Sequence, residues 1–408
     1  MKRSWLWLIL VWCLLCAASV SVRLVVTRAM DGDLQPGRLE SLAKHVSNTL
    51  DGGAILGWVI VGGRIMTSGN VWGAIVANMI GWAPWCLLLG LIVRGGWRVR
   101  AQAAGSDESP SAEQPVDDAR RRFLTRVVGI PAVTALGGAG IVATAVAPWR
   151  IRTAKYDVAI RDLPPSLDGV RIAFLTDTHL GRRIPVEHIE EAVRIAIDLN
   201  PDLFLLGGDY IDHAPSMIEP CAALLRPLVQ TGKPVVGVLG NHDYYTDAPR
   251  VMKAITAEGI HGLLNSRVYL TGSRALISRP VPGDCLCIAG LDDLWEGTPS
   301  IDAALDGVDP TIPRLVLSHN PDCAEEPNAG IHRVDLMLSG HTHGGQVRFP
   351  LVGAMIVPSR YGQKYAQGLV QGPHFPVVIS AGIGMAIVPV RLNVPPEVAE
   401  VTLRRTGA

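Results

Sequence analysis

The chain has 408 residues, and at ~100–200 residues per domain this length predicts two or three domains. Hydrophobic residues make up 48% of the chain and charged residues only 18%, which excludes an intrinsically disordered protein and points toward lipid. Basic and acidic residues balance at 37 each, so the net charge gives no sign of a nucleic-acid partner, and we expect none. Nine of the ten tryptophans lie within residues 1–149, which predicts an N-terminal membrane region followed by a soluble domain.

Three apolar segments in the N-terminal region are long enough to cross the core of a bilayer. They are residues 5–22, 71–93 and 127–149, and none of the three carries a charged side chain. Residues 54–61 form a shorter apolar stretch, which predicts an interfacial segment or one more span, so we expect three or four spans in total. A cleaved secretory signal is the alternative for the first segment, because residues 16–19 loosely resemble a cleavage site.

The segment between the second and the last span predicts which side of the membrane the C-terminal domain occupies. Its middle, residues 101–115, is polar and predicts no regular structure. Its flanks hold seven arginines, so the positive-inside tendency places this segment in the cytoplasm. The last span would then deliver everything after Trp149 to the opposite side. Arg120-Arg121-Arg122 also resembles a twin-arginine export signal, although we favour the basic flank of an ordinary anchor, and both interpretations give the same sidedness.

After Arg150 short apolar runs alternate with helical stretches. The runs are too short for helices and too apolar for half-exposed strands, so we interpret them as buried strands. This alternation predicts an α/β sheet with right-handed crossovers and helices on the outside. Further strand candidates after Asp322 indicate a second sheet. The five buried strands are predicted at residues 171–176, 203–206, 235–239, 315–317 and 336–338, and the later candidates are residues 377–380 and 398–403.

Two helices are predicted between the first three strands. Apolar residues share one face of residues 186–197, and Asn200 with the proline after it ends that helix. Ser216 can cap the second helix, which stops at Gly232. Pro227 lies inside this second helix and predicts a kink or an early end.

Polar clusters follow each of the five predicted strands, at the point where the strand ends. Each cluster alone is typical of a turn or a helix cap. In open α/β sheets, however, ligands bind beyond the carboxyl ends of the strands, so the five clusters would converge on one site. Five of the eleven histidines lie in these loops, which argues against chance. The clusters contain Asp177, His179, Asp209, Asp212, Asn241, His242, Asp243, His319, His341 and His343.

The chemistry of the converging donors predicts metal ions. Histidine, aspartate and asparagine without cysteine suit Zn, Fe or Mn. Two carboxylates and several imidazoles are more than one ion can use, so we expect two divalent metal ions as cofactors. Asp177 and Asp209 are 32 residues apart, and so are Asp209 and Asn241. This separation fits one βαβ unit between successive clusters.

The motifs, taken in full set and order, resemble those of the calcineurin-like metallophosphoesterases. They are Asp-x-His, Gly-Asp-x-x-Asp, Gly-Asn-His-Asp, Ser-His after a strand, and Gly-His-Thr-His-Gly-Gly-Gln. The resemblance covers about residues 150–405, and residues 382–384 and 389–397 are similar to its membrane-associated YkuE/YaeI-type branch. It implies a four-layer αββα sandwich, so we expect an α/β protein in which N-terminal transmembrane helices precede such a sandwich.

The resemblance also implies how the site residues divide. Asp177, His179 and His343 would bind one ion, Asn241, His319 and His341 the other, with Asp209 bridging both. A hydroxide held between the ions would attack phosphorus in line. His242 would stabilise charge or protonate the leaving oxygen. We expect Asp212 and Asp243 to orient loops or imidazoles rather than to bind metal.

These inferences divide the chain into four parts. Residues 1–100 form a transmembrane region of two or three spans, and residues 101–126 form a cytoplasmic linker. Residues 127–149 form the last span or a twin-arginine-like anchor, and residues 150–408 form the metallophosphoesterase domain. The protein would be a multi-pass protein of the inner (cytoplasmic) membrane with its catalytic domain outside the cytoplasm.

The expected function is hydrolysis of a phosphodiester or pyrophosphate in a cell-envelope substrate, either a lipid or a cell-wall polymer. One alternative is a UDP-diacylglucosamine-type pyrophosphatase, which would need its site on the cytoplasmic face. The other is a non-catalytic membrane sensor or assembly protein, which would be expected to have lost metal ligands. The sequence predicts neither the substrate nor the oligomeric state.

Overall fold

The computed structural model describes Ala143 and residues 146–181, 183–354, 356–386 and 389–406. Ala147–Ala408 belong to one compact unit of the chain. The predicted first and second spans and the linker lie outside the described residues, and so does nearly all of the predicted last span. Within the described ranges, no helix is both long enough and apolar enough to cross a membrane.

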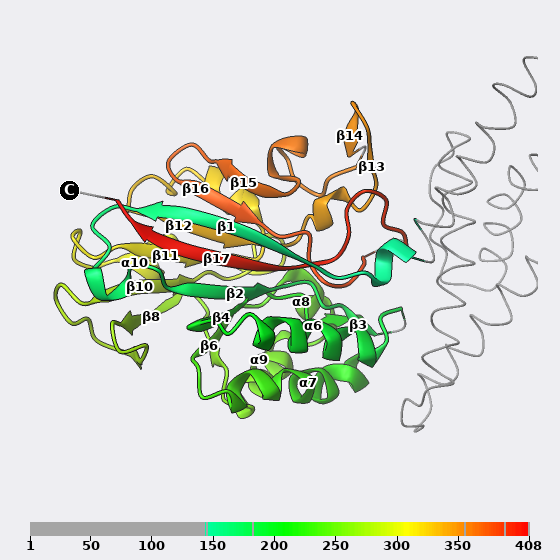
Figure 1. The fold of residues 1–408 in the computed structure, drawn as a ribbon, viewed down its shortest axis with the longest axis horizontal. Coiled ribbons are helices and arrows are strands. Elements are labelled where there is room, and N and C mark those ends of the chain that lie inside the picture. Colours follow the sequence, from blue (N-terminus) through cyan, green and yellow to red (C-terminus); the bar gives the residue numbers. More distant parts are fainter. Residues whose placement is uncertain (1–142, 144–145, 182, 355, 387–388, 407–408) are drawn as a thin grey trace, which may run out of the picture. The chain divides into compact units, whose positions relative to one another are not determined.

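The first sheet combines four parallel strands with two long strands at its edge. Across the sheet it contains β1 (Arg152–Ile160), β17 (Glu397–Arg405), β2 (Arg171–Leu175), β4 (Leu203–Leu206), β6 (Val235–Gly237) and β7 (His261–Gly262) (Figure 1). β2, β4, β6 and β7 run parallel, as strands joined by crossover connections do. β17 runs antiparallel to β2 and parallel to β1, so the last strand of the chain closes this sheet beside the first.

The second sheet has four parallel strands at its centre and antiparallel strands on both sides. Its order is β15 (Gly368–Gln371), β16 (Pro376–Ile379), β12 (Leu336–Ser339), β11 (Arg314–Leu317), β10 (Cys285–Gly290), β8 (Ser266–Thr271) and β9 (Leu276–Ile277). β16, β12, β11 and β10 are the parallel strands. Two short pairs lie outside both sheets: β3 (Leu180–Gly181) with β5 (Ile211–Asp212), and β13 (Arg348–Phe349) with β14 (Gly353–Ala354).

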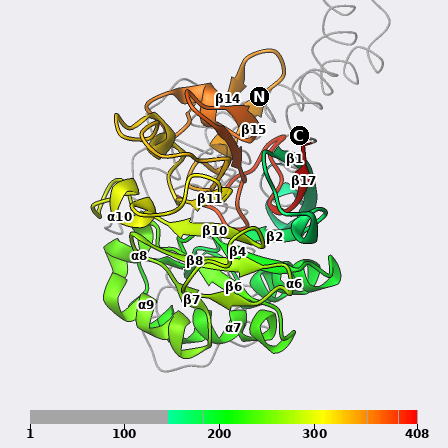
Figure 2. The ribbon, with the colours of Figure 1, turned by 90° about the vertical axis from the view of Figure 1, so that its left-hand side faces the viewer.

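Helices cover the outer faces of the sheets. Figure 2 shows α6, α7 and α9 gathered on one side of the strands. The α-helices are α6 (Val186–Asp198), α7 (Ile218–Gln230), α8 (Asn241–Thr246), α9 (Ala248–Ala257) and α10 (Ile301–Leu305). The 3₁₀ turns are η3 (Ala147–Trp149), η4 (Pro165–Leu167), η5 (Pro215–Met217), η6 (Pro321–Glu325), η7 (His343–Gly345) and η8 (Gly362–Tyr365).

The main hydrophobic core lies between the two sheets. Phe174 and Leu205 enter it from the first sheet, and Ile288 and Leu317 enter it from the second. Each side chain of this size contributes about 1.5–3 kcal/mol when it is fully buried, so the shared core fixes one sheet against the other. A second core joins the outer face of the second sheet to α10, η6 and η8. The predicted α/β class is confirmed.

The five predicted buried strands exist as β2, β4, β6, β11 and β12, but they do not share one sheet. The expectation that the second sheet begins after Asp322 is wrong, because β8, β10 and β11 precede that residue and belong to it. An apolar run has the same appearance in the sequence whichever of the two sheets its strand joins. The sequence therefore did not show which strands share a sheet.

The two predicted helices are present with one difference. α6 matches the predicted amphipathic stretch. α7 begins at Ile218, after a 3₁₀ turn that contains Ser216, so the residue at the cap position is Met217 and the predicted cap is wrong. Pro227 lies inside α7, which still continues to Gln230, because its apolar face stays packed across the proline.

Candidate metal centre

The carboxyl ends of parallel strands from both sheets meet at one edge of the domain. The loops after β2 and β4 are joined where the amide of Asp177 donates to the carbonyl of Gly208, at 2.9 Å. The loops after β11 and β12 are joined where Gly340 donates to the carbonyl of His319, at 3.0 Å. His319 Nδ1 also donates to the carbonyl of Gly207 at 2.8 Å, which links the two sheets. The five predicted clusters therefore converge although their strands belong to different sheets.

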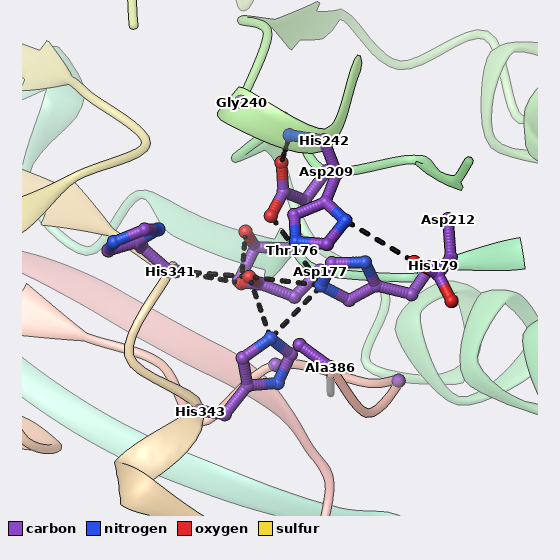
Figure 3. A network of polar contacts seen from close by, with 12 residues as sticks. Thr176, Asp177, His179, Asp209, Asp212, Gly240, His242, His341, His343 and Ala386 are labelled. Carbon is purple, nitrogen blue, oxygen red and sulfur yellow. Dashed lines mark hydrogen bonds and ion pairs between the residues drawn. The ribbon is translucent and has the colours of Figure 1, made fainter. Parts of the chain in front are cut away.

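One group of donors consists of Asp177, His179 and His343, all buried. Nε2 of His179 and Nε2 of His343 lie 3.0 Å apart. Nε2 of His343 lies 3.3 Å from Oδ1 of Asp177, and Nε2 of His179 lies 3.8 Å from that same oxygen. Figure 3 shows the two rings and the carboxylate pointing toward one another. Three donor atoms from two different loops thus face a common point.

A second group consists of Asp209, His319 and His341, also buried. Nε2 of His319 lies 3.2 Å from Oδ2 of Asp209, and Nδ1 of His341 lies 3.2 Å from the same His319 nitrogen. Oδ2 of Asp209 is also 3.5 Å from Nε2 of His179, a member of the first group. One carboxylate therefore lies between the two groups, where a bridging ligand of two cations is needed.

The donor set fits divalent cations by its spacing and by an unpaired atom. Ligand atoms at ~2.0–2.1 Å from a tetrahedral zinc lie roughly 3.3 Å from one another, which is the spacing within each group. Oδ1 of Asn241 is buried and has no hydrogen-bond partner among the described residues. A buried acceptor without a partner is costly, so this atom favours a bound cation. The absence of cysteine suits Zn, Mn or Fe.

Burial keeps most of the imidazoles neutral, as metal ligands must be. It lowers the pKa of His341 to about 3 and the pKa of His179 to about 4, so both rings offer lone pairs at neutral pH. Burial also lowers the pKa of His319, but the carboxylate of Asp209 outweighs this effect and raises that pKa above its ordinary value. A proton and a cation therefore compete for Nε2 of His319.

Several residues of the site have a backbone conformation that is unfavourable for any residue with a Cβ. Asp177, His179, Asp209, His341 and His343 all have φ between 46° and 68°, in the left-handed region. Such residues cost free energy that the surrounding structure must supply, and they cluster at functional sites. Gly208, with φ of 87°, lies so close to the backbone of Leu239 and Gly240 that a Cβ there would clash.

Asp243 contacts the backbone of the loop that carries Asp209. Its carboxylate accepts hydrogen bonds from the amides of Asp209 and Gly240, at 2.9 and 3.0 Å, and from the amide of Tyr210 at 2.8 Å. The side chain is fully buried in α8. Three amide donors on one carboxylate hold the loop after β4 against the start of α8, which fixes the position of Asp209 between the two groups.

His242 lies beside the first group and has a carboxylate of its own. Its ring meets the ring of His179 edge to face, with centroids 4.5 Å apart. Its Nδ1 is 3.3 Å from Oδ1 of Asp212, and its backbone amide donates to Oδ1 of Asp209 at 2.8 Å (Figure 3). His242 can also be grouped with His179 and Asp209 as a possible ligand set. The predicted aspartates and histidines thus lie together, and Asn241 begins α8 directly before His242 with its Oδ1 buried. The assignment of His242 to catalysis stays a prediction.

Sequence reasoning missed two residues that support the site and left the role of a third open. Thr176 donates to Oδ2 of Asp177 at 2.7 Å. Trp295 places its ring edge to face with His341, with centroids 4.2 Å apart. Neither belongs to a strand-end motif of His, Asp or Asn, so only the fold reveals them. Arg391 lies in the stretch 389–397, for which the sequence left a phosphate-binding, surface or packing role open; the structure buries it fully and places its Nη2 3.4 Å from Nδ1 of His343.

Comparisons with known proteins agree with the geometry. A family profile described as Calcineurin-like phosphoesterase matches residues 170–345. The chain is 31% identical to "Uncharacterized metallophosphoesterase YkuE" of Bacillus subtilis over 71% of this chain and 98% of that protein. It is 33% identical to "Phosphodiesterase YaeI" of Escherichia coli over 57% of this chain and 82% of that protein.

A vertebrate relative also matches. The chain is 30% identical to a "Transmembrane protein with metallophosphoesterase domain" of Danio rerio over 73% of this chain and 66% of that protein. The motifs, the two ligand groups and these similarities agree with one another. The chain belongs to the calcineurin-like phosphoesterases, which are metal-dependent phosphoester hydrolases with a dinuclear divalent metal centre, and within them it matches the YkuE/YaeI-type branch.

Proposed function

We propose that this protein is a membrane-bound phosphoesterase that hydrolyses a phosphodiester or pyrophosphate bond in a cell-envelope lipid or polymer. The observation that carries the proposal is the pair of buried ligand groups that meet at Asp209. When bound, two divalent cations ~3.5–4 Å apart would polarise a phosphate and supply an activated water near neutral pH. A degenerate binding module would be expected to lack ligands, whereas this chain retains the full set.

The residues of the two ligand groups and their neighbours have different roles in the proposed reaction. Asp209 places negative charge between the two groups, which offsets the repulsion between two cations. Asp177, His179 and His343 hold one side, and Asn241, His319 and His341 hold the other. His242 donates a proton to the leaving oxygen, and Asp212 keeps its ring oriented and protonated.

The proposal includes the membrane. The long apolar segments at residues 5–22, 71–93 and 127–149 support an N-terminal anchor. The Danio rerio relative is named a transmembrane protein, which supports the same assignment. We assign residues 1–100 and 127–149 to spans of the cell membrane, residues 101–126 to a cytoplasmic linker, and residues 150–408 to the extracytoplasmic side. The substrate is then a lipid or polymer phosphoester of the envelope and not a nucleic acid.

Activity profiling of the purified full chain tests this function. The protein is loaded with Mn or Zn in detergent and assayed on a phosphodiester lipid, a lipid pyrophosphate, a phosphomonoester lipid and a soluble nitrophenyl phosphodiester. We expect the highest kcat/KM on an envelope diester or pyrophosphate, and we expect the Asp209→Asn variant to be inactive on every substrate. A folded, metal-loaded wild-type protein that hydrolyses none of them would favour the non-catalytic alternative.

A further inference from the structure

The β13–β14 hairpin and the segment that follows it expose apolar side chains. At the tip of the hairpin, Leu351 has a relative exposure of 108% and Val352 one of 69%. After β14, Ile356 is 67% exposed and Tyr361 is 43% exposed. We call these four residues the hairpin patch. Single exposed apolar residues are common, but four within a short stretch of chain mark an interaction surface.

The hairpin is held firmly at its base. The amide of Arg348 donates to the carbonyl of Leu392 at 2.9 Å, and the amide of Leu392 donates to the carbonyl of Gln346 at 2.8 Å. On the other strand, the amide of Ala354 donates to Oε1 of Gln363 at 3.2 Å. These bonds join the hairpin to the segment before β17 and to η8, so the tip projects from a fixed base.

The tip carries a residue that turn chemistry disfavours. Leu351 has φ of 69°, in the left-handed region, where glycine or asparagine is more stable. The left-handed conformation costs free energy in an L-residue with a Cβ. A fully exposed leucine therefore occupies a position where a polar turn residue would stabilise the isolated domain. A contact that buries this leucine would offset the cost.

Strand pairing shows which end of the domain bears the hairpin. Ala399 of β17 pairs with Phe174 of β2, so the start of β17 lies beside the end of β2, where the metal centre begins. Glu397 pairs with Arg152, so β1 also starts at this end. The base of the hairpin follows η7, which contains the ligand His343, and it bridges to Leu392 just before β17. Figure 1 shows β13, β14 and the start of β1 at the same end of the sheets.

This end is the one that a membrane anchor would hold close to the bilayer. The predicted last span ends at Trp149, but the structure places Ala147–Trp149 in η3, where the Trp149 ring contacts that of His188 with centroids 5.5 Å apart. If the span ends at residue 146, six residues lead from it to Arg152, the start of β1. Six residues extend at most ~22 Å, which keeps the start of β1 near the lipid surface. The metal centre and the hairpin patch lie at this same end of the sheets.

We propose that the hairpin patch inserts into the surface of the lipid bilayer beside the metal centre. Apolar side chains flanked by an aromatic and a basic residue are typical of segments that lie at the membrane interface. Tyr361 is the aromatic residue, and Arg360 is the basic one. The side chain of Arg360 is 69% exposed, and its nearest carboxylate, that of Glu326, is 3.7 Å away, so it stays available to an anionic headgroup.

A hairpin in the bilayer surface also has a consequence for the substrate, and this consequence rests on the proposed function. If the hairpin lies in the bilayer surface, the metal centre opens toward the headgroups. A phosphoester of a membrane lipid could then reach the two ligand groups while its acyl chains stay in the bilayer. The substrate class is accordingly a membrane lipid with a phosphodiester or pyrophosphate in its headgroup, rather than a free nucleotide.

The position of the hairpin can be tested without any measurement of activity. The full chain is reconstituted into nanodiscs of phosphatidylethanolamine and phosphatidylglycerol, with an environment-sensitive fluorescent amino acid in place of Leu351. A matched variant carries the same amino acid in place of Ile331, which is 65% exposed. Ile331 precedes β12, whose far end leads to the metal centre, so it marks the opposite end of the domain. Nanodiscs with brominated lipids then report contact with the acyl chains.

We expect blue-shifted emission and strong quenching by brominated lipid at position 351, and water-like emission without quenching at position 331. Equal emission and equal quenching at the two positions would overturn the inference. Blue-shifted emission at position 351 without lipid quenching would also overturn it, because the patch would then be covered by protein. A lipid-quenched hairpin in a protein with no phosphoesterase activity would support the inference while it contradicts the proposed function.

Discussion

Nδ1 of His242 lies 3.3 Å from Oδ1 of Asp212, and the imidazole packs edge to face with the ring of His179. Burial lowers the pKa of His242, but the contact with Asp212 and the charge of Asp209 outweigh burial, so its pKa is raised. A raised pKa increases the protonated fraction of His242 at any given pH, which suits the ring to donate a proton to a leaving oxygen.

Replacing His242 by alanine tests this role. We expect His242→Ala to lower kcat by roughly 10²–10⁴, the usual range for general acid catalysis, on a substrate with a poor leaving group. The loss should shrink on a nitrophenyl ester, whose leaving group needs no proton. Steady-state kinetics on the two substrates measures the difference. Loss of a metal ion in the variant would instead assign His242 to the ligand set.

The contact with Asp212 predicts a change in the pH profile. A general acid works only while it is protonated, so activity should fall as pH rises through the pKa of His242. Asp212→Asn removes the anionic partner that raises this pKa, so the falling limb of kcat against pH should move to lower pH. Asp198→Asn, on the exposed surface of α6, serves as the matched control and should leave the profile unchanged. If the falling limb does not move in Asp212→Asn, the group that titrates in that limb is not His242.

Much of the site was predictable because its residues obey a local rule. Asp177, Asp209 and His319 each follow a buried apolar run by only a few residues, and strand ends are where ligands collect in α/β folds. The helix of residues 186–197 was predictable for a similar reason, since its apolar face repeats with helical period.

The rest depends on contacts between distant segments. Arg391 supports His343 from 48 residues away, and the sequence alone did not decide between a phosphate-binding, a surface and a packing role for it. The assignment of β11 to the second sheet depends on which core the strand faces, which is a tertiary property. The sequence did not predict β1, because exposed polar residues interrupt its buried residues and leave no long apolar run.

The position of Asp209 between the two ligand groups predicts different metal losses for different substitutions. Asp209→Asn removes charge from both groups, so we expect both ions to bind more weakly. His343→Ala removes a donor of one group, so we expect one ion to be lost while the other stays. Elemental analysis of the purified full chain should find close to two equivalents in the wild type. A wild-type protein that never binds more than one ion would contradict the dinuclear assignment.

The buried guanidinium of Arg391 predicts a loss of stability. Burial lowers the pKa of Arg391 to about 10, so it still carries its charge at neutral pH, and Nη2 donates to the carbonyls of Ala381 and Gly384 at 2.9 and 2.5 Å. Arg391→Met leaves these carbonyls unpaired at about 1–3 kcal/mol each. Denaturant unfolding measures the change. Arg360→Met, at an exposed position, should cost under about 1 kcal/mol. Equal losses of unfolding free energy in both variants would show that the contacts of Arg391 with the carbonyls of Ala381 and Gly384 do not stabilise the domain.

The arginines that flank residues 101–115 predict the sidedness of the catalytic domain. If they keep the linker in the cytoplasm, a reporter that is active only after export should be active when fused after Trp149 and inactive when fused within the linker. Protease added to intact spheroplasts should then digest the domain but not the linker. Arg120→Lys with Arg121→Lys separates two routes to this topology, because lost export would indicate a twin-arginine signal, whereas unchanged export would indicate an ordinary anchor. A domain that resists protease until the membrane is opened would reverse the orientation and favour a pyrophosphatase that acts on the cytoplasmic face.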